Sequence, residues 1–368
     1  SAHSCRPSSQ QDKHDSQHWP AFLLAFGLKQ TQQDVQALHY KVQQFRFEDK
    51  PKDKLLHSVG QRGSSEGYFC YPRGLSVASD GELAIADTEN HRVQLFNSAG
   101  VFKNIIGRGK GSAPGELDSP LDVAWMPTGN YAVADTGNSR VQIFRPKGSL
   151  RMMFLTRAAP VAIACDAGHN IIVVSEARQI EMYRKGCKFD KSFPIDTPTG
   201  AKSAAAAAAI ASPVQMYSVA ANRQLIALCD TACGVVRLFD YDGVCKLTFE
   251  PAASRPGLAV LPTSVDLSAD LLLIADATNH TVNAYALTGE FHQQALGPVD
   301  DLGNVQCARF TPEGHLAVTE FAANGLHCLK IFRFAPCDCH SERPTSAKKD
   351  KSTPIPKTHY TSDLVVPQ

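Results

Sequence analysis

Two stretches of the chain repeat almost the same sequence, Leu83-Ala-Ile-Ala-Asp-Thr-Glu-Asn-His-Arg-Val-Gln-Leu-Phe96 and Tyr131-Ala-Val-Ala-Asp-Thr-Gly-Asn-Ser-Arg-Val-Gln-Ile-Phe144. Each copy begins as an apolar strand that ends at an acid, passes through a polar turn, and resumes as a strand of alternating character. We expect the second strand of each copy to bury one face. The unit is therefore a β-hairpin, and a repeat of this quality indicates an array of similar units.

Four weaker copies extend the array to six units. Their paired segments are Ile171–Glu176 with Ile180–Tyr183, Ile226–Thr231 with Val236–Phe239, Leu273–Asp276 with Val282–Tyr285, and Leu316–Glu320 with Leu329–Phe332. A short apolar segment precedes each unit, often after a proline, and a turn and a further strand follow, as at Val101–Gly107. Four antiparallel strands per unit, six units and no convincing helix between them predict an all-β, six-bladed β-propeller.

The ends of the array indicate how the ring closes. Lys54–Gly60 has the character of a fourth strand without the three strands that should precede it, whereas the sixth unit ends after its third strand near Phe334. Because an unpaired strand would leave an open sheet edge, we expect the N-terminal strand to close the last blade. The propeller then spans residues 54–334, with a mostly flexible linker at 1–53 and a disordered tail at 335–368.

A family resemblance follows from these motifs. The pattern apolar-Ala-Asp-Thr-x-Asn-x-Arg-Val-Gln-apolar-Phe, followed by a Gly-rich loop such as Gly107–Leu117, resembles the NHL repeat, strongly in two units and partly in the other four. The chain is most similar to the C-terminal propellers of TRIM-NHL proteins of the Brain tumor and Thin type. The resemblance implies a module that recruits protein or RNA. In a full-length TRIM-NHL protein, a RING, B-box and coiled coil precede this module and make the whole protein a ubiquitin ligase, but none of them is recognisable in this chain.

One face of such a propeller carries both the loops that lead into the first strands and the turns between second and third strands. We expect it to bind the partner, because amides and imidazoles read hydrogen-bond patterns, Tyr stacks, and Arg pairs with phosphate or carboxylate. The candidate residues are Tyr71, Arg73, Glu89, Asn90, His91, Asn138, Ser139, Asn279, His280 and Asn324. A purely structural interpretation stands beside this one, because Asn is common in tight turns and the two histidines also suit solvated turns.

Two acid–arginine pairs have a structural interpretation. Asp87 and Arg92 lie at the two ends of the turn in the first repeat, and Asp135 and Arg140 occupy the same places in the second. We expect each pair to form an ion pair across its own hairpin and so to act as a structural staple of its blade.

The distribution of Lys, Arg, Asp and Glu along the chain helps to distinguish binding of a protein from binding of a nucleic acid. Residues 62–191 hold 16 basic and 13 acidic side chains, whereas residues 192–334 hold 8 and 13. No Lys or Arg occurs between Pro256 and Asn304. Because phosphate neutralisation needs clustered Lys and Arg, a nucleic-acid site could only be a local patch on the first three blades. Recruitment of a protein partner is therefore the leading prediction, and sequence-selective binding of single-stranded RNA, for post-transcriptional regulation, is the alternative.

A metal-dependent propeller enzyme of the lactonase or lyase type is a second alternative. Such an enzyme gathers carboxylates, His and amides around the central channel. The inner strands offer Asp122 and Asp266, but from non-adjacent blades, which makes a poor metal cage. The cluster Cys337, Cys339 and His340 lacks a second ligand pair at metal spacing. We therefore expect no intrinsic catalysis, no metal and no cofactor.

Composition predicts the setting in which the chain works. Eleven cysteines without regular pairing favour a reducing, cytoplasmic compartment. The apolar patch Trp19–Phe26 is too short to span a membrane. We expect a monomeric propeller without membrane attachment.

Overall fold

The computed structural model of this chain describes residues 54–195, 217–252, 260–321 and 326–334. The chain divides into two units, Ser1–Leu56 and His57–Gln368. Of the first unit, only Lys54, Leu55 and Leu56 are among the described residues. The predicted linker, the predicted tail, Asn324 and the cluster at Cys337 lie outside the described residues.

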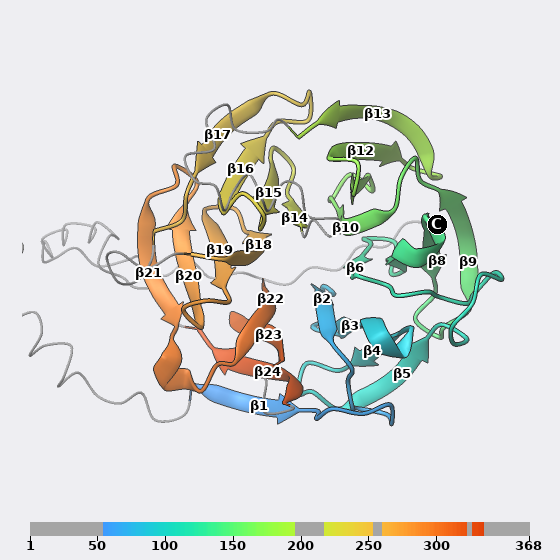
Figure 1. Cartoon of the computed structure of the whole chain (residues 1–368), viewed down its shortest axis with the longest axis horizontal. Coiled ribbons are helices and arrows are strands. Elements are labelled where there is room, and N and C mark those ends of the chain that lie inside the picture. Colours follow the sequence, from blue (N-terminus) through green and yellow to red (C-terminus); the bar gives the residue numbers. More distant parts are fainter. Residues whose placement is uncertain (1–53, 196–216, 253–259, 322–325, 335–368) are drawn as a thin grey trace, which may run out of the picture. The chain divides into compact units, whose positions relative to one another are not determined.

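Six four-stranded sheets surround a common axis in the described part of the chain (Figure 1). Blades one and two comprise β2 (Pro72–Val77), β3 (Leu83–Asp87), β4 (Arg92–Phe96) and β5 (Phe102–Ile106), then β6 (Asp122–Trp125), β7 (Tyr131–Asp135), β8 (Arg140–Phe144) and β9 (Leu150–Leu155). Blades three and four comprise β10 (Pro160–Cys165), β11 (Ile171–Ser175), β12 (Gln179–Arg184) and β13 (Lys188–Pro194), then β14 (Tyr217–Ala221), β15 (Ile226–Asp230), β16 (Val235–Phe239) and β17 (Cys245–Phe249). Blades five and six comprise β18 (Pro262–Leu267), β19 (Leu271–Asp276), β20 (Thr281–Ala286) and β21 (Phe291–Leu296), then β22 (Asn304–Phe310), β23 (His315–Phe321), β24 (His327–Arg333) and β1 (Leu55–Val59). The helices among the described residues are three 3-10 turns, η1 (Thr88–Asn90), η2 (Thr136–Asn138) and η3 (Pro298–Asp300). The fold is the predicted all-β, six-bladed propeller.

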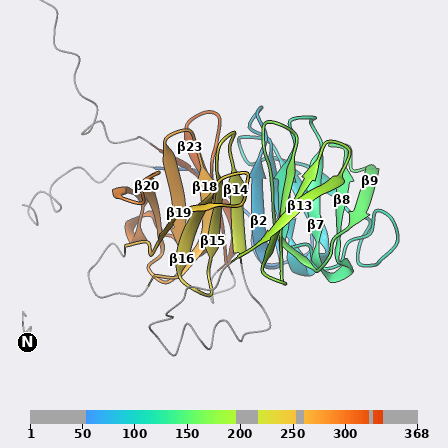
Figure 2. The same cartoon turned by 90° about the horizontal axis from the view of Figure 1, so that it is seen from above.

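The strands run from one face of the ring to the other, as the side view shows (Figure 2). The two ends of each blade therefore lie on opposite faces. The register places Asp87 opposite both Pro72 and Arg92, so the loop into the first strand and the turn after the second lie on the same face. We call this the front face; it carries the turns Thr88–His91 and Thr136–Ser139. The back face is the one at which the first strands end, at Val77 and Trp125.

The hydrophobic core lies between successive blades. One cluster joins blades one and two through Ile106, Leu117, Tyr131 and Val133, and comparable clusters join the following blades up to blade six. Every residue of β3, β4, β7 and β8 is buried, since a sheet that lies between two others has no side in contact with water. The near-continuous apolar runs of the second strands are typical of such doubly covered strands.

The second strand of each repeat is the third strand of its blade, β4 or β8. The expectation that this strand buries only one face is therefore wrong. Gln94 and Gln142 are both 0% exposed, as are most of their apolar neighbours. Gln94 is tolerated because its Nε2 donates hydrogen bonds to the carbonyl of Tyr68 at 2.7 Å and to Oδ2 of Asp87 at 3.0 Å. A buried polar group costs little when it is paired in this way.

The ring closes as predicted. Strand β1 pairs with β24, so the sixth sheet has the order β1-β24-β23-β22. Gly60 follows β1 with φ of 108°, and a Cβ there would lie 2.6 Å from the ring of Phe69 and 2.9 Å from the carbonyl oxygen of His327. Only glycine fits this junction, because both the left-handed backbone and the close approach exclude a side chain.

Removal of β1 should therefore open the ring. A chain that starts at Gln61 loses this strand, leaves the edge of β24 unpaired, and is expected to aggregate or to melt at least roughly 10 °C lower, since each kcal/mol shifts the midpoint of a large domain by a few degrees. Calorimetry with size-exclusion chromatography measures both effects. A chain that lacks only residues 1–45 is the matched control and should melt like the full chain. A stable monomer that starts at Gln61 would refute the closure.

Candidate interaction face and central channel

A buried carboxylate organises each of the first two turns on the front face. Oδ2 of Asp87 accepts hydrogen bonds from Asn90 Nδ2 at 2.8 Å, Arg92 Nε at 2.8 Å and Gln94 Nε2 at 3.0 Å. Oδ1 accepts the backbone N–H of Cys70 at 2.7 Å. The donors follow the acid by three, five and seven residues, so the turn and the next strand converge on one side chain. We call this set a carboxylate clamp.

Blade two repeats the clamp with the same spacing. Oδ2 of Asp135 accepts hydrogen bonds from Arg140 Nε at 2.6 Å, and from Asn138 Nδ2 and Gln142 Nε2 at 3.0 Å each. Oδ1 accepts the backbone N–H of Asp118 at 2.7 Å. Both Asp87 and Asp135 are 0% exposed. The two predicted pairs therefore lie in direct contact, each within a larger hydrogen-bonded set.

The arginine of each clamp also holds the loop that leads into its blade. Arg92 Nη2 donates to the carbonyls of Ser65 at 2.8 Å and Tyr68 at 2.9 Å. Arg140 makes the equivalent bonds to the carbonyls of Ser112, Ala113 and Glu116. A guanidinium has five N–H donors in a fixed plane, so it can serve the carboxylate and the loop together. The front loops of blades one and two are thereby tied to their sheets.

Three of the asparagines predicted as contact residues use their amides inside the protein. Asn90 Nδ2 bonds to Gly63 O as well as to Asp87, and Asn138 Nδ2 bonds to Gly111 O as well as to Asp135. Asn279 Nδ2 donates to Oδ2 of Asp276 in blade five. These amide groups therefore hold the turns.

Two of the residues that follow the turns, His91 and His280, contact the segment that leads into the next blade, whereas Ser139 contacts the end of its own blade. His91, Ser139 and His280 all have φ near 50°, which the tight turn imposes. Nδ1 of His91 accepts the backbone N–H of Ser119 at 3.0 Å, and Nδ1 of His280 lies 2.6 Å from the carbonyl of Gly303. The carbonyl of Ser139 accepts the backbone N–H of Thr156. The two histidines therefore bridge blades as well as facing solvent.

Tyr71 and Arg73 lie beside the front end of the channel. The Tyr71 ring makes edge contacts with Phe321 and His327, with ring centres 5.1 and 5.0 Å apart, and its backbone N–H donates to His327 Nδ1. Burial lowers the pKa of Arg73, while the nearby Glu89 carboxylate opposes this shift. The structure thus brings Tyr71, Arg73 and Glu89 together. His91, in contrast, turns towards blade two.

The channel itself contains an arginine that crosses between blades. Arg309 on β22 is 9% exposed, and its Nε donates to the carbonyl of Leu75 on β2 at 3.0 Å. Its Nη1 donates to the carbonyl of Val265 on β18 and lies 4.0 Å from Oδ1 of Asp266. One cavity of about 80 Å³ lies on the front side of Arg309 and another of about 180 Å³ lies on its back side.

Asp122 lies in the wall of the front cavity. Its Oδ1 accepts the backbone N–H of Val123 and its Oδ2 accepts that of Ile163, both at 2.9 Å. Burial raises the pKa of Asp122 to about 6, and the positive charge of Arg309 acts in the opposite direction. A Cβ on Gly74 would lie 2.1 Å from Oδ1 of Asp122, so glycine is required there. Asp122 and Asp266 come from blades two and five, and within the described ranges no three His, Cys, Asp or Glu side chains are grouped to hold a metal ion.

Sequence reasoning missed the two clamp glutamines and Arg309. The glutamines carried a usable signal, because Gln94 and Gln142 each follow the clamp acid by seven residues. Arg309 carried none, since its three contacts lie on two other blades.

The first clamp should be sensitive to loss of its charge. Asp87→Asn is expected to lower the free energy of unfolding by about 1 to 3 kcal/mol, because an amide nitrogen must then face donors of Arg92 or Cys70. Urea denaturation measures this loss, and Glu66→Gln, an exposed change in the loop that leads into blade one, is the control. Unchanged stability together with lost partner binding would instead identify Asp87 as a contact residue.

Asp122 should make stability depend on pH. Because its pKa is raised in the folded state, its contribution is fully present below the unfolded pKa near 4 and is lost as pH rises through about 6. We expect the stability of Asp122→Asn relative to the wild type to increase by up to about 3 kcal/mol between pH 4 and 7, measured by urea denaturation. A difference that stays constant with pH would show that Asp122 does not titrate in this range.

Comparison with known proteins supports the repeat assignment. The family model described as NHL repeat matches residues 69–96 and 117–144, which cover the hairpins of blades one and two. Tripartite motif-containing protein 3 of Mus musculus is 41% identical over 56 residues, 15% of this chain and 8% of the relative. Protein brain tumor of Drosophila melanogaster is 37% identical over 54 residues, 14% of this chain and 5% of the relative. The matched segments are thus a small part of these relatives.

One solved structure shares the architecture at low sequence identity. A chain of the Mitotic Checkpoint Complex has a TM-score of 0.52 at 14% identity, with 78% of this chain and 98% of that chain covered. A virginiamycin B lyase from Staphylococcus aureus has a TM-score of 0.49 at 10% identity, with 76% and 88% covered. At these identities the first likeness concerns the fold alone. Among the described residues no helix has the length and apolarity to cross a membrane.

The family assignment rests on the two clamp sequences, on the closed ring of six blades and on the matched relatives. This chain carries NHL repeats in a six-bladed β-propeller and resembles the propellers of TRIM-NHL proteins.

Proposed function

We propose that this chain is a non-catalytic interaction propeller that recruits a protein partner at its front face. The grouping of Tyr71, Arg73 and Glu89 carries this proposal, because it combines an aromatic ring with both signs of charge. Arg73 lies in the wall of the front cavity, and the backbone N–H of Glu89 donates to the carbonyl of Cys70, the residue before Tyr71. The clamps of blades one and two tie the neighbouring loops to the sheets. Binding residues on loops held by a rigid scaffold are the usual design of recognition surfaces.

The resemblance suggests a role within a longer protein. In a TRIM-NHL-type ubiquitin ligase, this propeller would select the substrate while a RING domain supplied the catalysis. We place its action in the cytoplasm, because the eight cysteines of the described ranges are all free thiols. We further propose that the propeller acts as a monomer.

Binding of single-stranded RNA is the second candidate function. Arg62, Arg108 and Lys110 are exposed on the loops that lead into blades one and two, so a phosphate backbone could be neutralised there. No Lys or Arg lies in the described stretch 260–304, so RNA could not be held around the whole ring. We therefore rank protein recruitment first.

The front-face contact should be lost on substitution of its three residues. We expect Tyr71→Ala/Arg73→Ala and, separately, Glu89→Lys to weaken capture of a cytosolic partner by about 2 kcal/mol, roughly 30-fold. Quantitative cross-linking in extract, followed by titration of the recovered protein, measures this loss. Lys147→Glu, an exposed change in a turn on the back face, is the matched control and should bind like the wild type. Equal losses in all variants would contradict a front-face site.

A titration with RNA tests the ranking. A fluorescently labelled U-rich strand should bind only weakly and without sequence preference, and the binding should fall steeply between low and physiological salt. Arg62→Glu/Arg108→Glu should abolish this weak binding. If the wild type instead binds the U-rich strand selectively at submicromolar concentration, and Tyr71→Ala/Arg73→Ala weakens that binding by about 2 to 4 kcal/mol, RNA is the primary ligand.

A further inference from the structure

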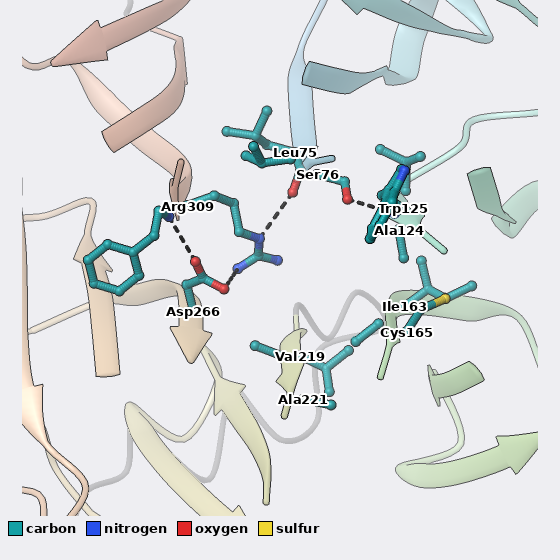
Figure 3. A pocket seen from close by; sticks show the side chains of 15 residues that line it. Leu75, Ser76, Ala124, Trp125, Ile163, Cys165, Val219, Ala221, Asp266 and Arg309 are labelled. Atoms are coloured by element: carbon teal, nitrogen blue, oxygen red, sulfur yellow. Dashed lines mark hydrogen bonds and ion pairs between the residues drawn. The ribbon is translucent and has the colours of Figure 1, made fainter. Parts of the chain in front are cut away.

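The cavity on the back side of Arg309 is a built site away from the front face. It has a volume of about 180 Å³ and lies where the inner strands β2, β6, β10, β14 and β22 end (Figure 3). Arg309 and Asp266 lie on one side of it and face Trp125, Ile163 and Val219 on the other. An apolar cavity of about 150 Å³ accommodates benzene, so this one has room for a ligand of about six to eight non-hydrogen atoms.

The polar side of the cavity has one donor and one acceptor to spare. Arg309 uses Nε and Nη1 on the carbonyls of Leu75 and Val265, and among the described residues nothing accepts a hydrogen bond from Nη2. Figure 3 shows the third guanidinium nitrogen directed away from Asp266 towards the cavity. Asp266 uses Oδ2 on the backbone N–H of Phe310 at 2.8 Å, whereas Oδ1 has only Arg309 Nη1, at 4.0 Å.

Arg309 and Asp266 are too far apart to satisfy each other fully. At 4.0 Å the Arg309–Asp266 pair is looser than a direct hydrogen bond, although the Arg309 side chain is 10% exposed and the Asp266 side chain 19%. Neither Arg309 Nη2 nor Asp266 Oδ1 is fully buried, and a ligand that fills the cavity takes both atoms out of water, so groups that complete their hydrogen bonds are favoured there. A ligand that accepts from Nη2 and donates to Oδ1 would satisfy both.

The charge balance restricts the chemistry of that ligand. The cavity lining holds one positive and one negative side chain, Arg309 and Asp266. A carboxylate would be attracted by Arg309 but repelled by Asp266, and an ammonium group would meet the reverse. A neutral group that carries an acceptor and a donor close together avoids both penalties, and the apolar wall at Trp125 and Val219 suits a short carbon chain.

We propose that this back cavity binds a primary carboxamide, either a small free amide or the Asn or Gln side chain of a protein inserted along the axis from the back face. The amide oxygen accepts from Arg309 Nη2, and the amide nitrogen donates to Asp266 Oδ1. This site is independent of the front-face function, so either can fail without the other.

The two tryptophans of the chain provide a direct assay. In a Trp19→Phe background, Trp125 is the remaining tryptophan and lines the cavity. Propanamide is expected to change the fluorescence of Trp125 saturably, with a millimolar dissociation constant. The dissociation constants of propanoate and propylammonium should each be at least tenfold higher. Tighter binding of propanoate, or no saturable change with any of the three up to about 100 mM, would overturn the proposal.

A capped Ala-Ala-Gln-Ala-Ala peptide distinguishes the two sources. Binding at least as tight as that of propanamide identifies a protein side chain as the occupant, and exclusion of the peptide while propanamide binds identifies a free amide. The same peptide with Glu in place of Gln is the control and should bind at least tenfold more weakly than the Gln peptide if the side chain enters the cavity.

Substitution of Asp266 should change the selectivity. In Asp266→Asn, the amide oxygen can still accept the Phe310 N–H while its nitrogen faces the ligand, so the acceptor is lost and the negative charge removed. We expect propanamide to bind at least tenfold more weakly and propanoate to bind more tightly than in the wild type, an inversion that misfolding cannot produce. Leu155→Ser, at an exposed position on the rim, should leave both affinities unchanged. An unchanged preference in Asp266→Asn would refute the assigned geometry.

Discussion

The structure depends on a buried acid at the front end of the second strand in most blades. Asp87 and Asp135 each accept a backbone N–H from the loop that leads into their own blade. Asp276 and Glu320 do the same in blades five and six, from Leu261 and Gly303. Burial raises the pKa of Asp87, and the hydrogen bonds from Cys70, Asn90 and Arg92 act in the opposite direction, so the donors offset part of the cost of burying the carboxylate. The acid therefore joins the strand, its turn and the incoming chain at one point.

The cation that balances this acid differs among the blades. Blades one and two use the arginine of the turn, whereas in blade six Lys330 on β24 lies 2.7 Å from Glu320. In blade three Ser175 replaces the acid, and Arg178 reaches into blade four to Asp230, which Arg237 also contacts. Within the described ranges, Asp276 pairs with Asn279 and with no cation. The acid is thus kept in the other five blades while its partners vary, which explains why only two repeats are obvious in sequence.

Burial on both faces has consequences for function. Because neighbouring blades cover the sheets, side chains for recognition are found at the two faces, the rim and the channel. At the front face many polar groups are hydrogen-bonded within the clamps, including the amides of Asn90 and Asn138. Tyr71, Arg73 and Glu89 lie where the clamp of blade one meets the channel, and this favours them over the asparagines as contact residues. In the channel, Arg309 joins blade six to blades one and five through the carbonyls of Leu75 and Val265.

The sequence alone determined the six hairpin units, the closure by Lys54–Gly60 and the pairing of Asp87 with Arg92, because hairpins and their turns are made by neighbours in the chain. It did not reveal the burial of Gln94, since alternation with apolar residues has the same pattern whether the polar residue faces water or an internal acceptor. Only the tertiary structure decided the role of Arg309, whose contact with Leu75 joins residues 234 positions apart. The closing of the ring brings these residues together, and no local pattern in the chain records that contact.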